Sequence, residues 1–587
     1  MVFRLLCITP VDTVVGKEFG ALAGMVATIG GRITCLRRGQ REVEMIGECD
    51  RRSLILGFAA TAFGAMAASR SWSAEAGADA SLRAQPWAVW DDGEKPVRGG
   101  YLRLAATQYI GKMNPNHWPV QDWVSMGYFH EKLMVTDGSY NPTVPWLAKS
   151  FSYETPTAVL MQLHEGVTFH DGSAFNAASV KYQIDWIRNP ANGAWSASWL
   201  EPLETVEVVD ECTLRWKFKK PWAGFPGVIS NVPGYALSAK ALQELGEQYD
   251  SHPQGTGAYM LEEASPGNFL KLKRNPNWWF AKASGHPDMP YFDGILVTVI
   301  PDPSVQLANL RAGKLDVLSV DKSQYSIVKE DPALNVYRLP LNHTRALRFN
   351  NTKGVFQDIR LRQAVSVAID RKALIAGTQF GLGRIASCLY PEDHWAHNPE
   401  LKPVAYDPAR AKELLAAAGY AKGLSVRGYF TASTAAQTVA DAIKNMLAKV
   451  GIDWQVEPLA PAAVAARMKA LDYDLAEGGW VFIYDPDLAA TGLYSPGGGF
   501  NFGRSKNDAA IALIEAGRGE VDPKKRQQIY WQLEKVLYDS YEDVWLWWEE
   551  SVTAYHKNVM GWNQEQFLKY KEAWFWSHPL WFKDGKA

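Results

Sequence analysis

The sequence predicts an α/β protein of two or three domains, and three observations carry that prediction. Between residues 346 and 377 a strand pattern leads into two helix patterns. Between residues 407 and 459 helix patterns again alternate with strand patterns, which is typical of α/β folds. The chain has 587 residues, of which 47% are hydrophobic, so it is long enough for more than one hydrophobic core.

The stretch from 346 to 377 shows how local chemistry defines these elements. Residues 346–350 alternate as a short strand does, after a separate strand expected over residues 336–344. Asp358 is placed to accept hydrogen bonds from the free amides of a helix start, and apolar residues then recur at helical spacing at 361, 364, 365, 368 and 369. Asp370 starts a second helix, which ends near Gly377.

The run FNNTKGVFQDIRLRQAVSVAIDRKAL, residues 349–374, resembles the signature of a known family. That family comprises the large extracytoplasmic solute-binding proteins of ABC importers for dipeptides, oligopeptides and related solutes. The resemblance implies a two-lobed periplasmic binding protein fold of the large, three-subdomain type, with a ligand cleft between the lobes. The motif is structural in the family, so it identifies the scaffold and not the ligand.

Further blocks follow the order of the same family, among them residues 145–188, Gly255–Tyr259, Leu270–Trp279 and the helix pattern that starts at Asp407. The resemblance therefore implies a division of the chain into lobes. The first lobe would span 77–345, with an extra subdomain at about 125–245, the second lobe 346–543, and a return to the first lobe with the C-terminal tail 544–587.

Residues 45–76 have the pattern of an export signal. The pair Arg51 and Arg52 precedes a mildly apolar run, and residues 74–76 form an A-x-A cleavage site, which indicates a signal peptide of the twin-arginine type. Because a signal peptide begins near its own methionine, we expect Met45 to be the start and residues 1–44 to be upstream or disordered. The protein is then exported, soluble and periplasmic.

Composition and cysteine usage exclude several classes of site. The net charge of -2 gives no basic excess for nucleic acid. After removal of the leader, Cys212 and Cys388 remain, and they either form one disulfide or stay free, with Cys212 expected as a buried thiol in a strand. No Cys/His spacing indicates a metal, and no cofactor is expected.

Three histidine and aspartate positions, His164, His170 and Asp171, invite comparison with a metal site. One strand and one turn do not supply a closed ligand set, so we expect a hydrogen-bonded turn there. The 24 tryptophans leave two alternatives, ordinary packing in a core or an aromatic-lined cleft.

The first group of candidate ligand-binding residues lies in the loop that follows the first strand of the mature chain. In the family, the corresponding loop lies near the cleft. The resemblance makes Tyr109, Asn114 and Trp118 candidates for the cleft wall, with plain loop packing as the alternative.

The second group lies in the segment 472–487, which resembles the strand and cleft loop of the family. Peptide binders of the family place an aspartate three residues after a tryptophan, where it pairs with the α-ammonium group of the peptide. In this chain, Ile483 lies three residues after Trp480, and Tyr484 and Asp485 follow. A buried ammonium group without a carboxylate is unfavourable, so either Asp485 or Asp487 replaces the missing partner or the ligand has no free amine there. As a turn former before a proline, Asp485 also has a purely structural explanation.

A glycine-rich loop over residues 491–511 supplies the last candidates. Asn501 and Arg504 are placed to face the cleft, and the forked guanidinium of an arginine suits an anionic group. A solvated loop charge is the alternative.

The resemblance implies the substrate-binding component of an ABC importer, which captures a peptide or peptide-like solute and delivers it to an inner-membrane permease with its ATPase subunits. The protein would be a monomer without catalytic residues. The departure at Ile483 also favours non-peptide solutes such as opines, modified amino acids or oligosaccharides. A secreted hydrolase is the alternative from another class, but Glu549 and Glu550 are neighbours in a strand pattern and point to opposite faces.

Overall fold

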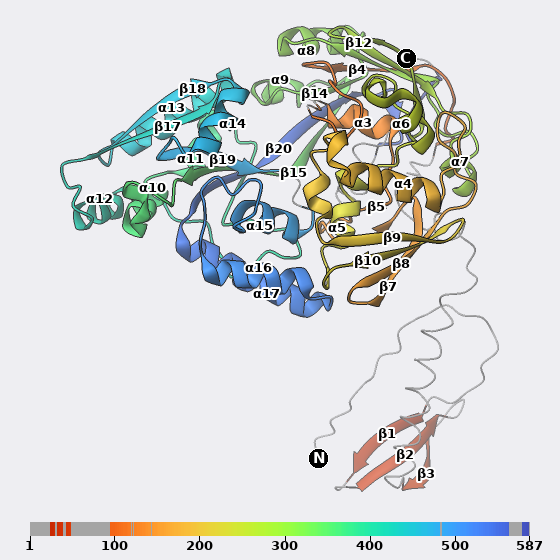
Figure 1. Ribbon diagram of the computed structural model, residues 1–587, viewed down its shortest axis with the longest axis horizontal. Helices are drawn as coiled ribbons and strands as arrows, with labels where there is room; N and C mark the ends of the chain where they lie inside the picture. Colours follow the sequence, from red (N-terminus) through yellow and green to blue (C-terminus); the bar gives the residue numbers. More distant parts are fainter. Residues whose placement is uncertain are drawn as a thin grey trace. The chain divides into compact units, whose positions relative to one another are not determined.

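Helices and strands alternate along most of the chain in the computed structural model (Figure 1). The structure describes residues 94–118, 120, 122–142, 144–481, 484–562 and 578–585, together with three strands nearer the N-terminus. These strands, β1 (Gly24–Ile29), β2 (Arg32–Arg38) and β3 (Val43–Glu48), form an antiparallel sheet within a separate unit, Met1–Ser81. β3 includes Met45, the predicted start of the leader, and residues 49–76 lie outside the described residues, so the leader stays a prediction.

A sheet of nine strands runs through the second unit, Leu82–Ala587, in the order β11-β12-β13-β4-β14-β20-β15-β19, with β16 paired to β20. Its bounds are β4 (Tyr101–Ala106), β11 (Tyr259–Ser265), β12 (Phe269–Arg274), β13 (Gly294–Val299), β14 (Val317–Val320), β15 (Leu334–Phe349), β16 (Arg384–Ile385), β19 (Leu475–Trp480) and β20 (Asp543–His556). β13, β4 and β14 are parallel, whereas β20 is antiparallel to both β14 and β15.

The first lobe adds an antiparallel sheet, β7-β8-β10-β9, inside the range predicted for the extra subdomain. Its other elements pack around the two sheets. The bounds are α3 (Trp123–Phe129), β5 (Met134–Val135), β6 (Val144–Pro145), β7 (Ala148–Thr155), β8 (Ala158–Leu163), α4 (Ala177–Arg188), β9 (Leu203–Asp210), β10 (Thr213–Phe218), α5 (Phe225–Ile229), α6 (Ala239–Leu245), α7 (Trp279–Ala283), α8 (Pro303–Arg311), α9 (Tyr325–Val328), β21 (Val559–Met560) and β22 (Trp581–Phe582).

The second lobe carries a parallel pair of strands, β17 and β18, and most of the longer helices. The bounds are α10 (Ile359–Val367), α11 (Arg371–Thr378), α12 (Pro408–Ala417), β17 (Leu424–Thr431), α13 (Thr434–Ala448), β18 (Ile452–Leu459), α14 (Pro461–Ala470), α15 (Pro486–Tyr494), α16 (Asp508–Gly519) and α17 (Pro523–Ser540). The predicted helix starts at Asp358, Asp370 and Asp407 are confirmed, since each of these residues accepts a hydrogen bond from an amide in the first turn of its helix.

Two long strands connect the lobes, and Figure 1 shows β15 and β20 running side by side between them. The pairing is regular from Leu334 to Pro340 and resumes at Thr344, with one register shift between Pro340 and Thr344 and a second between Arg345 and Ala346. Pro340 has no amide hydrogen to donate to the ladder, so a bulge at this place is expected.

The structure corrects two predictions. The strands expected separately over 336–344 and 346–350 are one strand of 16 residues, because β20 pairs with residues on both sides of the expected break at 345. Cys212 lies half-buried in the turn before β10 and not in the strand. Cys212 and Cys388 are both free thiols, and Cys388 is buried.

Each lobe has its own hydrophobic cores. One cluster includes Leu102, Phe129 and Trp216 of the first lobe, and two others gather around Trp454 and Tyr530 of the second. Ten of the described tryptophans are buried: Trp146, Trp216, Trp222, Trp278, Trp454, Trp480, Trp545, Trp547, Trp548 and Trp581. Packing in the interior therefore accounts for much of the high tryptophan content.

Candidate functional site

A cavity of about 640 Å³ lies between the lobes, within the usual range for small-molecule sites. The first lobe contributes the end of β14 and the turn after it, and the hinge strands β15 and β20 form the floor. The second lobe contributes the end of α11, the end of β17, the first turns of α13 and the middle of β19. Because both lobes supply walls, a molecule bound here would contact both at once.

Four charged side chains of alternating sign run along one side of this cavity. Lys322 forms an ion pair with Glu549, and its Nζ donates to Oε1 of Gln379 at 2.8 Å. Nε of Arg345 donates to Oε1 of Glu549 at 2.9 Å. The last link is longer, since Nη1 of Arg345 lies 3.5 Å from Oε1 of Glu477. We call Lys322, Glu549, Arg345 and Glu477 the charge row.

Burial and the neighbouring charges set the ionisation of the charge row. Burial alone would raise the pKa of Glu549, but Arg345 and Lys322 outweigh it and lower that pKa. Burial alone would lower the pKa of Arg345, and Glu549 outweighs it in turn and raises it. Burial, with Arg345 nearby, lowers the pKa of His343 to about 4, so this imidazole in the cavity wall is neutral at pH 7.

A backbone amide holds the carboxylate of Glu477, the last residue of the charge row. Oε2 of Glu477 accepts a hydrogen bond from the amide of Thr431 at 2.6 Å. Glu477 lies on β19 opposite Leu347 of β15, while Arg345 lies opposite Gly479, so the two charged residues are diagonal neighbours on adjacent strands. The side chain of Arg345 is 51% exposed and that of Glu477 25% exposed.

Two further cavities lie among the described residues. One of about 390 Å³ adjoins the first cavity, since Ser319, Leu341 and Ser551 line both, and its wall also includes Asp122, the N-cap of α3. The other, of about 490 Å³, is in the second lobe and is lined by Arg362, Arg504 and Lys506 together with Glu542.

Of the nine predicted site residues, the eight that the structure describes lie outside the lining of the 640 Å³ cavity. Tyr109 is half-buried against the core of the first lobe. Asn114 is fully buried, and its Oδ1 accepts the amide of Asn116 at 3.0 Å. Trp118 is 62% exposed, with its ring edge-on to Trp195. These three residues stay predictions, since nothing here tests their contact with a ligand.

Trp480, at the end of β19, and Tyr484 after it have partners inside the protein. Ile483 lies outside the described residues. Trp480 is buried against Phe500, with ring centroids 4.6 Å apart. The ring of Tyr484 faces Nζ of Lys132 at 5.7 Å, which is a contact between the lobes.

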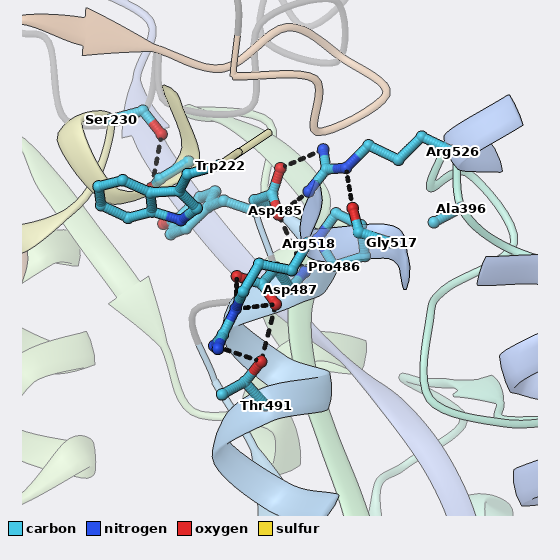
Figure 2. Close-up of polar contacts among 12 residues, drawn as sticks. Trp222, Ser230, Ala396, Asp485, Pro486, Asp487, Thr491, Gly517, Arg518 and Arg526 are labelled. Atoms are coloured by element: carbon cyan, nitrogen blue, oxygen red, sulfur yellow. Dashed lines mark hydrogen bonds and ion pairs between the residues drawn. The ribbon is translucent and has the colours of Figure 1, made fainter. Parts of the chain in front are cut away.

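Asp485 and Asp487 are both occupied inside the protein, as Figure 2 shows. Asp485 is fully buried and receives two hydrogen bonds from Arg526, at 2.7 and 2.8 Å. It is also the N-cap of α15, since Oδ1 accepts the amide of Asp487 at 2.9 Å. Asp487 pairs with Arg518 and accepts a hydrogen bond from Thr491. The structural role of Asp485 is thus clear, and its carboxylate is not free for a ligand ammonium group.

Asn501 and Arg504 belong to the loop between α15 and α16. Nδ2 of Asn501 donates to the carbonyl oxygens of Ser495 and Ser505, so this buried side chain connects two parts of the loop. Arg504 lines the 490 Å³ cavity of the second lobe.

The charge row is the feature that sequence reasoning missed. Lys322, Arg345, Glu477 and Glu549 come from four segments without a shared motif, and Glu549 was considered only as half of a catalytic pair. The sequence did contain a signal for it, because each of the four segments carries an acidic or basic residue beside apolar residues. Strand order was needed to place them side by side.

The comparison with known families decides the relationship. Residues 142–502 match the model of the bacterial extracellular solute-binding proteins, family 5. The chain belongs to this family. The match covers more than half of the chain and includes the signature at 349–374, so the predicted family and fold class are confirmed.

Several family 5 proteins resemble the chain over most of its length. The glutathione-binding protein GsiB of Salmonella typhi is 26% identical over 411 residues, which cover 68% of this chain and 79% of GsiB. The periplasmic binding protein DppA from Helicobacter pylori, in complex with the peptide STSA, has a TM-score of 0.70 at 22% identity and covers 83% of this chain and 99% of DppA. AgaA from A. tumefaciens R10, in complex with agropinic acid, has a TM-score of 0.70 at 22% identity and covers 82% of this chain and 99% of AgaA.

Two kinds of feature are absent from the part of the chain that the structure describes. None of the described helices is both long enough and apolar enough to cross a membrane. In the same part of the chain, no group of three or more His, Cys, Asp and Glu side chains is arranged to hold a metal ion.

Proposed function

We propose that this protein is the solute-binding component of an ABC importer and that it captures a peptide or peptide-like solute between its lobes. Family 5 membership supports the class of function, and the 640 Å³ cavity bounded by both lobes is the observation that carries the proposal. The captured solute would be delivered to an inner-membrane permease with its ATPase subunits.

The proposed mechanism needs no chemical step. A solute in the cavity contacts the turn after β14 in the first lobe and β19 in the second, so it stabilises the closed arrangement over an open one. The hinge strands β15 and β20 take up the movement at the bulge after Pro340. The permease would then recognise the closed population.

Peptide-like solutes that lack a conventional amino terminus fit the loop after β19 better than ordinary peptides. The carboxylates of Asp485 and Asp487 are engaged by Arg526 and Arg518. Among similar proteins, GsiB is named for glutathione and the AgaA structure holds agropinic acid. We therefore retain opines and modified amino acids beside peptides as candidate solutes, and oligosaccharides as a further class.

Export through the leader at 45–76, a periplasmic location and a monomeric state complete the proposal. The relatives are binding proteins and not enzymes. Glu549 and Glu550 are each paired with an arginine, Arg345 and Arg338 respectively.

The test is to purify the full chain from its native host and identify the co-purified solute. Native mass spectrometry of the intact protein, followed by release and fragmentation, gives the mass and the class of the solute. We expect one bound small molecule per chain. A protein that carries no solute and binds none from a cell extract, but turns over chromogenic peptides or glycosides, would contradict the proposal.

A further inference from the structure

We propose that Arg345 and Glu477 together bind a zwitterionic α-amino-acid head group of the solute, with the carboxylate on Arg345 and the ammonium group on Glu477. The inference rests on the proposed function and deepens it, because it names a class of solute. The class comprises molecules whose ammonium and carboxylate sit on one carbon, such as γ-linked peptides and side-chain-modified amino acids. Ordinary α-linked peptides, whose termini are far apart, fall outside it.

Both charged groups are held in place from behind. Glu549 binds Nε of Arg345 at 2.9 Å, and Glu549 is itself paired with Lys322. The amide of Thr431 holds the other carboxylate oxygen of Glu477 at 2.6 Å. Groups that are fixed before the solute arrives bind it at a lower entropic cost.

The link between the two residues is the weakest in the charge row. Nη1 of Arg345 and Oε1 of Glu477 are 3.5 Å apart, at the limit of a hydrogen bond, and both side chains line the cavity. A zwitterion inserted at this link replaces one long ion pair with two shorter, charge-assisted hydrogen bonds. Neither residue needs to give up its contact with Glu549 or Thr431.

The spacing of the two charges selects the head group. Arg345 and Glu477 are diagonal neighbours on β15 and β19, so the sheet fixes a cation and an anion side by side. In an α-amino acid the ammonium and carboxylate groups share one carbon and lie equally close together. A dipeptide separates these groups by a further residue, so it satisfies one charge of the pair at a time.

The rest of the cavity suits an uncharged or apolar remainder. Phe430 and Val439 line it, and Phe380, which is 55% exposed, lies at its edge. His343 adds a neutral imidazole, because burial lowers its pKa to about 4.

The first experiment compares two isomers by isothermal titration calorimetry on the full chain. The probes are S-methyl γ-Glu-Cys-Gly and S-methyl α-Glu-Cys-Gly, which have the same composition but differ in the head group. We expect the γ-linked isomer to bind at least tenfold more tightly. Equal binding, a preference for the α-linked isomer, or no binding of either isomer would overturn the inference.

The second experiment uses variants. Arg345→Met and Glu477→Gln should each weaken binding of the γ-linked isomer by roughly tenfold to a hundredfold. Arg345→Lys should recover part of the loss because it keeps the charge without the fork. Arg427→Met and Asp472→Asn, which break an exposed ion pair of the same lobe, are matched controls and should stay within about twofold. Unchanged affinity in both cavity variants would overturn the inference.

The identity of the solute from the native host distinguishes a failure of this inference from a failure of the proposed function. A released solute that carries ammonium and carboxylate on one carbon supports the inference. A released solute without that head group overturns the inference and leaves the proposed function intact. A chain without any solute-binding activity contradicts the proposed function itself.

Discussion

At the scale of single residues, the carboxylate of Glu131, which is surrounded by indole groups, shows most clearly how burial changes a pKa. Glu131 is buried in the first lobe, and its two oxygens accept hydrogen bonds from the indole nitrogens of Trp146, Trp278 and Trp279 at 3.0 to 3.1 Å. Burial raises the pKa of Glu131 from its ordinary value of 4.5 to about 7, against the effect of these donors. The folded state therefore holds this proton more tightly than the unfolded state.

The first prediction concerns pH. Because the folded pKa of Glu131 is raised, its contribution to stability is fully present below pH 4.5 and is lost as the pH rises through about 7. Glu131→Gln mimics the protonated state, so the variant should lose this part of the pH dependence, which is on the order of 3 kcal/mol. The measurement is urea unfolding at intervals from pH 4.5 to 8.

The comparison between the variant and the wild type matters here, since burial lowers the pKa of His130 to about 3, and such buried histidines also make stability depend on pH over this range. Their contribution cancels in the difference. Glu201→Gln, at an exposed position, serves as the control. Parallel curves for the wild type and Glu131→Gln would refute the account.

At the scale of elements, the start of a helix depends on interactions between residues that are close in the sequence, so the sequence was sufficient to predict it. Oδ1 of Asp370 accepts the amide of Ala373 at 2.9 Å at the start of α11. Asp370→Ala should lower the free energy of unfolding by about 1 kcal/mol, whereas Asp370→Asn, which keeps the accepting oxygen, should change it by less than half as much. Chemical denaturation checks both variants, and equal losses would show that the cap is not the cause.

The contact between α15 and α17 is an element-scale feature that depends on the tertiary fold. Asp485 and Arg526 form an ion pair in which the side-chain exposures are 0% and 8%. Arg526→Met should destabilise the protein by about 3 to 5 kcal/mol, because it leaves a buried carboxylate without a partner. The double variant with Asp485→Asn should recover part of this loss.

Urea unfolding of the single and double variants measures the coupling. Arg410→Met, which removes an exposed pair with Glu413, is the control and should cost less than about 1 kcal/mol. If Arg526→Met behaved like this control, the buried pair would have no stabilising role.

At the scale of the whole molecule, the lobes meet along α5 as well as at the hinge. Figure 2 shows Trp222 and Ser230, which flank α5, beside Asp485. Gly227 of α5 lies so close that a Cβ there would be 2.1 Å from the Cβ of Asp485. The amide of Ala223 donates to the carbonyl oxygen of Arg518 at 2.7 Å. The contact at this place therefore leaves no room for a side chain on residue 227.

Gly227→Ala is therefore expected to hold the lobes apart. Small-angle X-ray scattering with saturating solute should show a larger radius of gyration for the variant than for the wild type, together with weaker binding. Gly377→Ala, where an added Cβ meets nothing within 4 Å, is the matched control. A variant that closes like the wild type would show that the α5 contact adapts at little cost.

Much of the fold was available from the sequence because its signals are local. Caps such as Asp358 and Asp407 act within one turn, and the signature at 349–374 identified the scaffold. The break expected at residue 345 was wrong because β20, which comes much later in the chain, pairs with β15 on both sides of it. Local patterns do not contain such a partner.

The sequence by itself determined the family, the alternation of helices and strands and the absence of an aspartate three residues after Trp480. The tertiary structure alone decided which charges meet. It paired Asp485 with Arg526, 41 residues away, and aligned Lys322, Glu549, Arg345 and Glu477 along one cavity. The physical reason is that the Coulomb energy of a charge depends on its distance to other charges in space and on burial, and neither quantity is fixed until the strands have paired.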